Sequence, residues 1–131
     1  MKSFPDVADL AEQYLAAWNA TDVDAIVALH SADSRFQVHA GAPAVEGLDA
    51  LRAAFADVFV RYPGFTAEVH RVLYGDRHWV LDWTLTFQPT GEERRGFHCL
   101  DVVDIDEAGL VARKDTFVNH AQQAAAMGAA A

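Results

Sequence analysis

A single acidic residue interrupts an otherwise apolar face of the strand-like segment FHCLDVVDI, residues 97–105. Alternate strand residues point the same way, so Asp101 shares one face with Phe97, Cys99, Val103 and Ile105. An ionised carboxylate is costly in an apolar site unless it takes up a proton or finds a donor. Asp101 is therefore the first candidate for acid–base chemistry. The structural alternative is a carboxylate that reaches water or pairs with an arginine.

Aromatic side chains form a row on one face of the clearest predicted strand, residues 78–88. Trp79, Trp83 and Phe87 lie on that face, and a flat apolar ligand would fit against them. A row of this kind is also typical of a simple packed core. We interpret Cys99, the only cysteine, as a small buried apolar residue.

Metal and cofactor chemistry find little support in the sequence. The six histidines show no recurring two- or four-residue ligand spacing, and there is no second cysteine. A glycine-rich phosphate loop and the order of a serine triad are also missing. We therefore expect no metal and no cofactor.

Length and composition limit the number of domains, the kinds of partner and the cellular location that can be expected. A chain of 131 residues with 52% hydrophobic content fits one globular domain over residues 1–131. The formal net charge of −9 disfavours nucleic acid and anionic membranes as partners. There is no apolar run of signal-peptide or membrane-spanning length, and one cysteine cannot form an internal disulfide, so we expect a cytoplasmic protein.

Helical periodicity dominates the first half of the chain. An apolar stripe from Val7 to Trp18 predicts a helix, with Ser3 and Pro5 suited to its start. A second helix is predicted after Thr21 as its cap, carrying His30 inward. A strand over residues 34–40 and a third helix over residues 48–62 follow.

The period changes to two after residue 64. Strands are predicted over residues 65–74, 78–88, 96–106 and 110–118, and such sequential strands indicate an antiparallel meander. The alanine-rich tail from His120 suits a short terminal helix. The prediction is an α+β fold, a strongly curved antiparallel sheet wrapped around three N-terminal helices.

The outer face of this sheet is not fully polar. Leu100 and Val102 fall there beside Thr84 and Thr86, which predicts a homodimer through the outer sheet face. Scattered surface hydrophobic residues on a monomer are the alternative.

Several stretches resemble the nuclear-transport-factor-2-like superfamily. They are QYLAAWNATDVDAIVALHSADSRF, EGLDALRAAF and DVVDIDEAGLVARKDTFVNH, and the resemblance runs from about Val7 to Gln122. The superfamily includes ketosteroid isomerases, SnoaL-type polyketide cyclases, epoxide hydrolases and binding-only domains, so it implies a cone-shaped fold more strongly than one function. In the isomerases a tyrosine and a protonated aspartic acid form the oxyanion hole. Tyr14 and Asp101 match them here.

The resemblance departs from the isomerases at the catalytic base. Val38 stands where their proton-abstracting carboxylate would be, and the adjacent His39 is the substitute candidate. Simple alternation turns His39 away from the face of Val38, and a bulge would be needed to bring it inward.

A second comparison within the superfamily concerns the epoxide hydrolases. Their aspartate, arginine, aspartate arrangement is matched in residue type by Asp101, Arg113 and Asp115. Alternation leaves open which set of the last strand faces the cone, Arg113 with Asp115 or Lys114 with Thr116. An inward Lys114 would hold Asp101 ionised and defeat the neutral-acid hypothesis.

These observations favour a cofactor-independent isomerase or cyclase acting on an apolar carbonyl compound through an enol-like intermediate. Tyr14 and Asp101 would stabilise the oxyanion, with His39 as base. The alternatives are a non-catalytic domain that binds an apolar small molecule or serves dimerisation, and epoxide-hydrolase-like activation of water. The expected substrate-binding residues are Trp18, Val38, Phe55, Trp79, Trp83, Phe87, Phe97 and Cys99.

Overall fold

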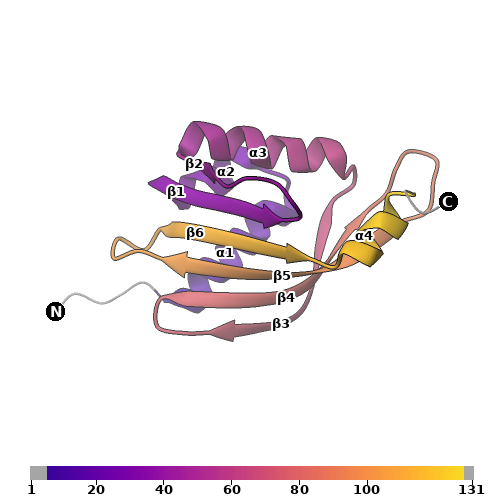
Figure 1. Cartoon of the computed structure of the whole chain (residues 1–131). Helices are drawn as coiled ribbons and strands as arrows, with labels where there is room; N and C mark the ends of the chain where they lie inside the picture. The colour runs from indigo at the N-terminus through magenta and orange to yellow at the C-terminus, as the bar shows by residue number, and fades with distance from the viewer. Residues whose placement is uncertain (1–5, 129–131) are drawn as a thin grey trace.

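The computed structural model describes residues 6–128, in which four helices accompany one six-stranded sheet (Figure 1). The predicted helix-start residues Ser3 and Pro5 lie outside the described residues. The elements are α1 (Val7–Asn19), α2 (Val23–Ala28), β1 (His30–His39), β2 (Val45–Glu46), α3 (Leu48–Arg61), β3 (Thr66–Tyr74), β4 (His78–Phe87), β5 (Arg95–Ile105), β6 (Val111–Val118) and α4 (His120–Ala126).

Aspartate side chains cap the first two helices. Asp6 accepts a hydrogen bond from the Ala8 amide, and Asp22 accepts one from Ala25. The prediction of Thr21 as the cap of α2 was wrong, because Thr21 has a positive φ of 51° while Asp22 has the extended backbone that a cap needs.

The second helix is shorter than predicted. It ends at Ala28, so His30 starts β1 and does not belong to α2. His30 is nevertheless buried, as the sequence predicted.

One six-stranded sheet, in the order β2-β1-β6-β5-β4-β3, makes up the curved half of the molecule. β3 to β6 form the predicted antiparallel meander. The sheet is mixed, however, because β1 pairs parallel with β6, an arrangement that the crossover through α3 and the meander permits. The α+β fold class is confirmed.

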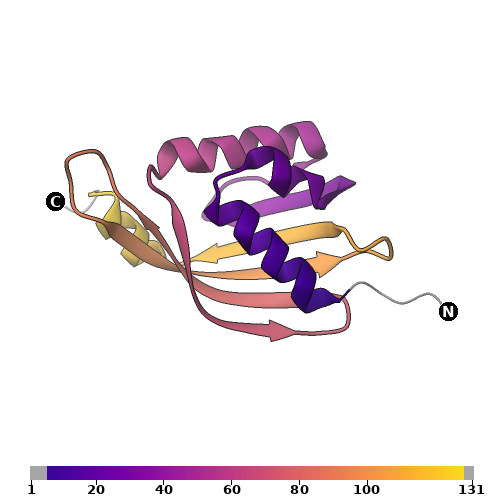
Figure 2. The same ribbon diagram turned by 180° about the vertical axis from the view of Figure 1, so that it is seen from behind.

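The helices and the sheet enclose the apolar core. Figure 2 shows α1 crossing one face of the sheet and α3 lying along its β1 side, while α4 packs against β5. Alternation in β4 is as predicted, with Trp79, Leu81, Trp83, Leu85 and Phe87 all buried toward the helices. None of the helices within residues 6–128 is long and apolar enough to cross a membrane.

Candidate active site

Asp101 is buried on the inner face of β5, with 3% of its surface exposed. Its Oδ1 accepts a 2.8 Å hydrogen bond from the Thr116 hydroxyl, and its Oδ2 lies 3.7 Å from the Lys114 ammonium. The β5–β6 register explains this, because it sets Asp101 opposite Thr116 and Val103 opposite Lys114. Both partners favour the carboxylate form. The prediction of a protonated Asp101 that donates to an oxyanion is therefore wrong.

Lys114 is as deeply buried as its partner, with 4% of its surface exposed. Its Nζ lies 4.0 Å from the ring centroid of Trp18, 5.0 Å from Tyr14 and 5.6 Å from Phe36. Burial lowers the pKa of Lys114, and the carboxylate of Asp101 opposes that shift. The aromatic faces also favour the cation. The inner face of the sheet thus carries a desolvated ion pair.

The hydroxyl of Tyr14 hydrogen-bonds to a histidine. Its hydroxyl lies 2.8 Å from His30 Nε2, and His30 Nδ1 lies 2.8 Å from the Ser34 hydroxyl. Burial raises the pKa of Tyr14 well above its ordinary value. Burial, and then the nearby Lys114 charge, lower the pKa of His30 to about 3. A neutral tyrosine, a neutral imidazole and a serine therefore form one buried chain of hydrogen bonds.

The neutral state of His30 gives a pH-dependent stability. A histidine with a folded pKa of about 3 and an unfolded pKa near 6.5 binds more protons when unfolded. The contribution of His30 to the free energy of unfolding is fully present above pH 6.5 and is lost as the pH falls toward 3. As the pH falls from about 6 to about 5, we expect this group to lower the free energy of unfolding by up to about 1.4 kcal/mol per pH unit.

Urea unfolding at several pH values measures this slope. His30→Gln should flatten it, whereas His78→Gln, at an exposed position, should leave it unchanged. The groups that face His30 are Tyr14, Ser34 and Lys114, and none of them titrates in this window in the unfolded chain. Equal slopes in wild type and His30→Gln would contradict the assignment.

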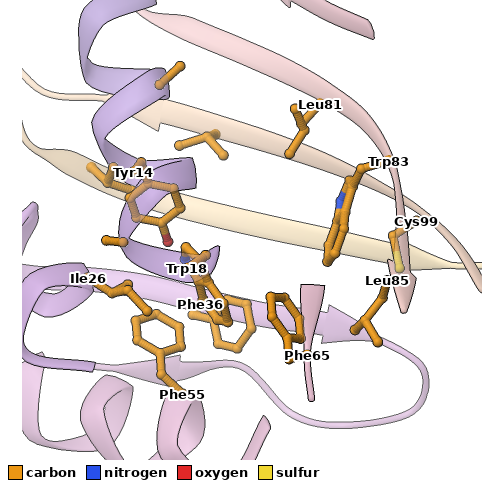
Figure 3. Packing of buried hydrophobic residues seen from close by; sticks show 14 of the residues in the cluster. Tyr14, Trp18, Ile26, Phe36, Phe55, Phe65, Leu81, Trp83, Leu85 and Cys99 are labelled. Atoms are coloured by element: carbon orange, nitrogen blue, oxygen red, sulfur yellow. The ribbon is translucent and has the colours of Figure 1, made fainter. Parts of the chain in front are cut away.

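Two cavities lie between the helices and the inner face of the sheet, with volumes of about 50 and 260 Å³. Trp18, Phe65, Trp83 and Lys114 line both, so the two cavities adjoin; we call them together the hollow. Asp101 and Tyr14 line the smaller cavity. Figure 3 shows Tyr14 and Trp18 on one side of this core and Trp83 on the other. The ion pair is thus accessible to a small guest.

Six of the eight predicted substrate-binding residues line the hollow: Trp18, Val38, Trp79, Trp83, Phe97 and Cys99. Phe55 and Phe87 do not, and the prediction was wrong for both. Phe55 is completely buried against the rings of Trp18, His30 and Phe36, and Phe87 packs against Tyr62. Alternation along β4 or helical spacing cannot separate core from pocket, because both kinds of residue face inward.

The remaining lining residues refine the site. Burial raises the pKa of the Cys99 thiol to about 12, so this thiol is a wall residue and not a nucleophile. Gln123 of α4 lines the larger cavity and donates a hydrogen bond to the Tyr62 hydroxyl. The C-terminal helix therefore closes one end of the hollow.

His39 lies on the outer face of the sheet and lines neither cavity. Its Nε2 is 2.8 Å from Asp115, and its ring stacks on Phe117 at 4.2 Å. The irregularity in β1 falls between His30 and Arg35, so no bulge turns His39 inward. The prediction of His39 as the catalytic base is therefore wrong.

Arg113 and Asp115 are paired on this same outer face, at 2.7 Å. The aspartate, arginine, aspartate arrangement is thus split between the two faces of the sheet, with only Asp101 inside. Sequence reasoning had left the orientation of the last strand open, and it missed His30 and Ser34 as partners of Tyr14. Within residues 6–128, no group of three histidine, cysteine or acidic side chains converges in a way that would hold a metal ion.

Comparisons with solved structures give the same fold. SalBIII, an epoxide hydrolase/cyclase-like enzyme in pyran ring formation in salinomycin, is 18% identical, with a TM-score of 0.77 over 88% of this chain and 92% of its own. A protein of ketosteroid isomerase-like fold from Catenulispora acidiphila is 13% identical, with a TM-score of 0.80 over 96% of this chain and 95% of its own. AclR from Streptomyces galilaeus, provisionally assigned as a hydroxylase, is 18% identical, with a TM-score of 0.81 over 98% of this chain and 100% of its own.

The TM-scores establish the nuclear-transport-factor-2-like fold, and identities this low do not transfer an activity. A search of curated proteins gives no match. Residues 11–114, however, match the SnoaL-like domain family, and this range includes Tyr14, Asp101 and Lys114. The chain therefore belongs to the SnoaL-like domain family.

Proposed function

We propose that this protein is a small cofactor-independent isomerase or cyclase that acts on a compact apolar carbonyl compound through an enol-like intermediate. The observation that carries the proposal is the desolvated pair of Asp101 and Lys114 on the wall of the hollow. The SnoaL-like family and the cyclase-like neighbour support the same class of reaction.

The ion pair supplies the two groups that enolisation needs. The carboxylate of Asp101 is the base: it takes a proton from the carbon next to the carbonyl, and the electron pair of that C–H bond moves toward the oxygen. The ammonium of Lys114 stabilises the negative charge that develops there. Return of the proton to another carbon completes an isomerisation. In a cyclisation the enolate carbon attacks a second carbonyl carbon, the π electrons of that carbonyl move to its oxygen, and Asp101 returns the proton to the alkoxide that forms.

The apolar walls strengthen both effects. Trp18, Phe36 and Tyr14 surround the ammonium, so water does not screen its charge. The Tyr14–His30–Ser34 chain lies beside the pair and holds the tyrosine ring in place. Tyr14 thus acts as a positioning residue in this scheme, and Asp101 and Lys114 contact the substrate.

Cavity size limits the substrate. An apolar cavity of about 150 Å³ holds a benzene-sized guest, and typical sites for drug-sized ligands have about 300 Å³ or more. The larger cavity, of about 260 Å³, lies between these values. A compound of one or two rings fits this volume, with its reacting carbonyl group extending into the smaller cavity, which Asp101 lines.

Exchange of carbon-bound protons in deuterium oxide tests the proposal without knowledge of the natural substrate. We expect wild-type protein to accelerate deuterium incorporation into 1-tetralone, 1-indanone or cyclohex-3-enone above the buffer rate, measured by mass spectrometry. Lys114→Met should abolish the acceleration. Arg113→Met, the neighbouring cation on the outer face, should retain it. Absence of protein-dependent exchange in all three ketones would overturn the proposal.

A second function, binding without catalysis, is favoured by one observation. Val38 lines the larger cavity at the position where the isomerases carry their base. A protein of this kind would bind the same ketones tightly and show no deuterium exchange, so the same experiment separates the two functions.

We also retain the homodimer as a proposal. Leu100 and Val102 are half-buried on the outer face of β5, beside Thr84 and Thr86 of β4. A second copy of the sheet would cover them. Sedimentation that shows a monomer at micromolar concentration would remove this proposal.

A further inference from the structure

Two indole N–H groups on the wall of the hollow, those of Trp18 and Trp83, are without a hydrogen-bond partner among the described residues. Trp83 is 5% exposed, and its Nε1 is buried. A third buried nitrogen atom, Arg35 Nε, shares this property, but Arg35 donates to Gln37 through another nitrogen. The indole of Trp18 adjoins the Tyr14 hydroxyl. Trp83 is therefore the clearest unsatisfied donor.

An unsatisfied donor in this position is costly. Leaving a buried N–H group without an acceptor costs about 1–3 kcal/mol. The neighbours of Trp83 on the inner face of β4 are Leu81 and Leu85, and neither side chain has an acceptor for the indole N–H group. The indole N–H thus contributes nothing to the fold that a plain ring would not.

The location of Trp83 indicates what the donor is for. Trp83 lines both cavities, as does Lys114, so the indole and the ammonium border the same guest. A guest that displaces water from this wall must offer an acceptor to the N–H group or lose affinity. Hydrogen bonds to buried polar groups of this kind discriminate strongly between ligands that have and lack the matching atom.

We propose that Trp83 is a specificity-determining residue that donates its indole N–H to a second oxygen of the substrate. This inference rests on the proposed function, in which Lys114 binds the first oxygen, the reacting carbonyl. The substrate is then a one- or two-ring compound with two oxygens, such as a hydroxy ketone or a dicarbonyl. A ketone with a single oxygen leaves the N–H group unsatisfied.

Matched ligands and a matched variant test this assignment by isothermal titration. The ligands are tetralin, 1-tetralone and the set of ring-hydroxylated 1-tetralones, and the proteins are wild type and Trp83→Phe. We expect at least one hydroxylated isomer to bind wild type about 5- to 10-fold more tightly than 1-tetralone, the value of one net hydrogen bond. Trp83→Phe should reduce that preference to less than about 2-fold. Its retention, or the lack of any preference in wild type, would overturn the inference.

Phe87→Leu is the matched control, because Phe87 lies on the same face of β4 and lines neither cavity. This variant should keep the preference for the hydroxylated isomer. Thermal unfolding checks that each variant is folded. Loss of the preference in both variants would point to general damage to the hollow and would overturn the assignment to Trp83.

Indole N–H resonances give a second measurement on the unmodified protein. The chain has three tryptophans, so three such signals are expected, and the spectrum of Trp79→Phe helps to assign them. The Trp83 signal should move downfield with the hydroxylated ligand and not with tetralin. A signal that does not respond would contradict the proposed bond even if Trp83→Phe failed to fold.

The failures of the two proposals are distinguishable. Deuterium exchange into 1-tetralone with no effect of Trp83→Phe on ligand preference would overturn the inference and leave the proposed function intact. Loss of the preference in Trp83→Phe without any deuterium exchange would support the recognition of two oxygens and overturn the catalytic function.

Discussion

Asp101→Asn is expected to lower the rate of deuterium exchange, or of turnover of the natural substrate, by about 10³-fold. A positioned general base contributes on the order of 10² to 10⁴ in rate, and an amide cannot accept the proton. The asparagine amide would keep the shape of the carboxylate and could still accept a hydrogen bond from Thr116. The expected loss is therefore chemical and affects the rate constant more than substrate binding.

The control for this variant lies three residues further along the same strand. Asp104 is exposed on the outer face of β5, so Asp104→Asn should retain full activity. Because Asp101→Asn leaves the Lys114 ammonium without its charge partner, activity should be measured well below the unfolding temperature of the variant. A loss smaller than about 10-fold in a folded Asp101→Asn variant would rule out Asp101 as the base.

The second large effect concerns stability. Asp101→Leu should lower the free energy of unfolding by about 3–5 kcal/mol, because it leaves a buried ammonium without a carboxylate. Lys114→Met should also destabilise, since it leaves the carboxylate buried with only the Thr116 hydroxyl as donor. The double variant replaces the whole pair with apolar side chains of similar volume, and methionine packs well against the aromatic rings around position 114.

We therefore expect the double variant to be more stable than Asp101→Leu alone and close to the wild type. Chemical denaturation of the four proteins gives the coupling free energy directly. If the losses of unfolding free energy in the two single variants add up in the double variant, the coupling free energy is zero. The ion pair would then make no contribution to stability. A double variant that is as stable as the wild type and catalyses nothing would show that the pair is kept for function and not for stability.

The inward direction of Asp101 could be predicted from the sequence for a simple physical reason. Phe97, Cys99 and Val103 share its face, and burial of that apolar row fixes the orientation of the whole strand. The row of Trp79 and Trp83 in β4 was predictable in the same way. The resemblance to the nuclear-transport-factor-2-like superfamily added the cone-shaped fold, which the match to the SnoaL-like family supports.

The partners of Asp101 were not predictable in this way. The last strand alternates between Lys114 with Thr116 and Arg113 with Asp115, and all four are polar, so no apolar row selects the inner face. The register between β5 and β6 makes the selection by setting Thr116 opposite Asp101. Because Lys114 faces inward, Asp101 is one member of an ion pair and not the neutral acid that the sequence predicted.

The sequence by itself determined the fold class, the inward aspartate and the aromatic wall, because each follows from periodicity along one element. The tertiary structure alone decided that Tyr14 pairs with His30 and that Lys114 faces Asp101. A hydrogen bond between residues that are distant in the sequence leaves no periodic pattern in that sequence. Such contacts depend on strand register and helix placement. The size of the hollow depends on the same packing, since Phe55 and Trp83 both face inward and only one of them meets empty space.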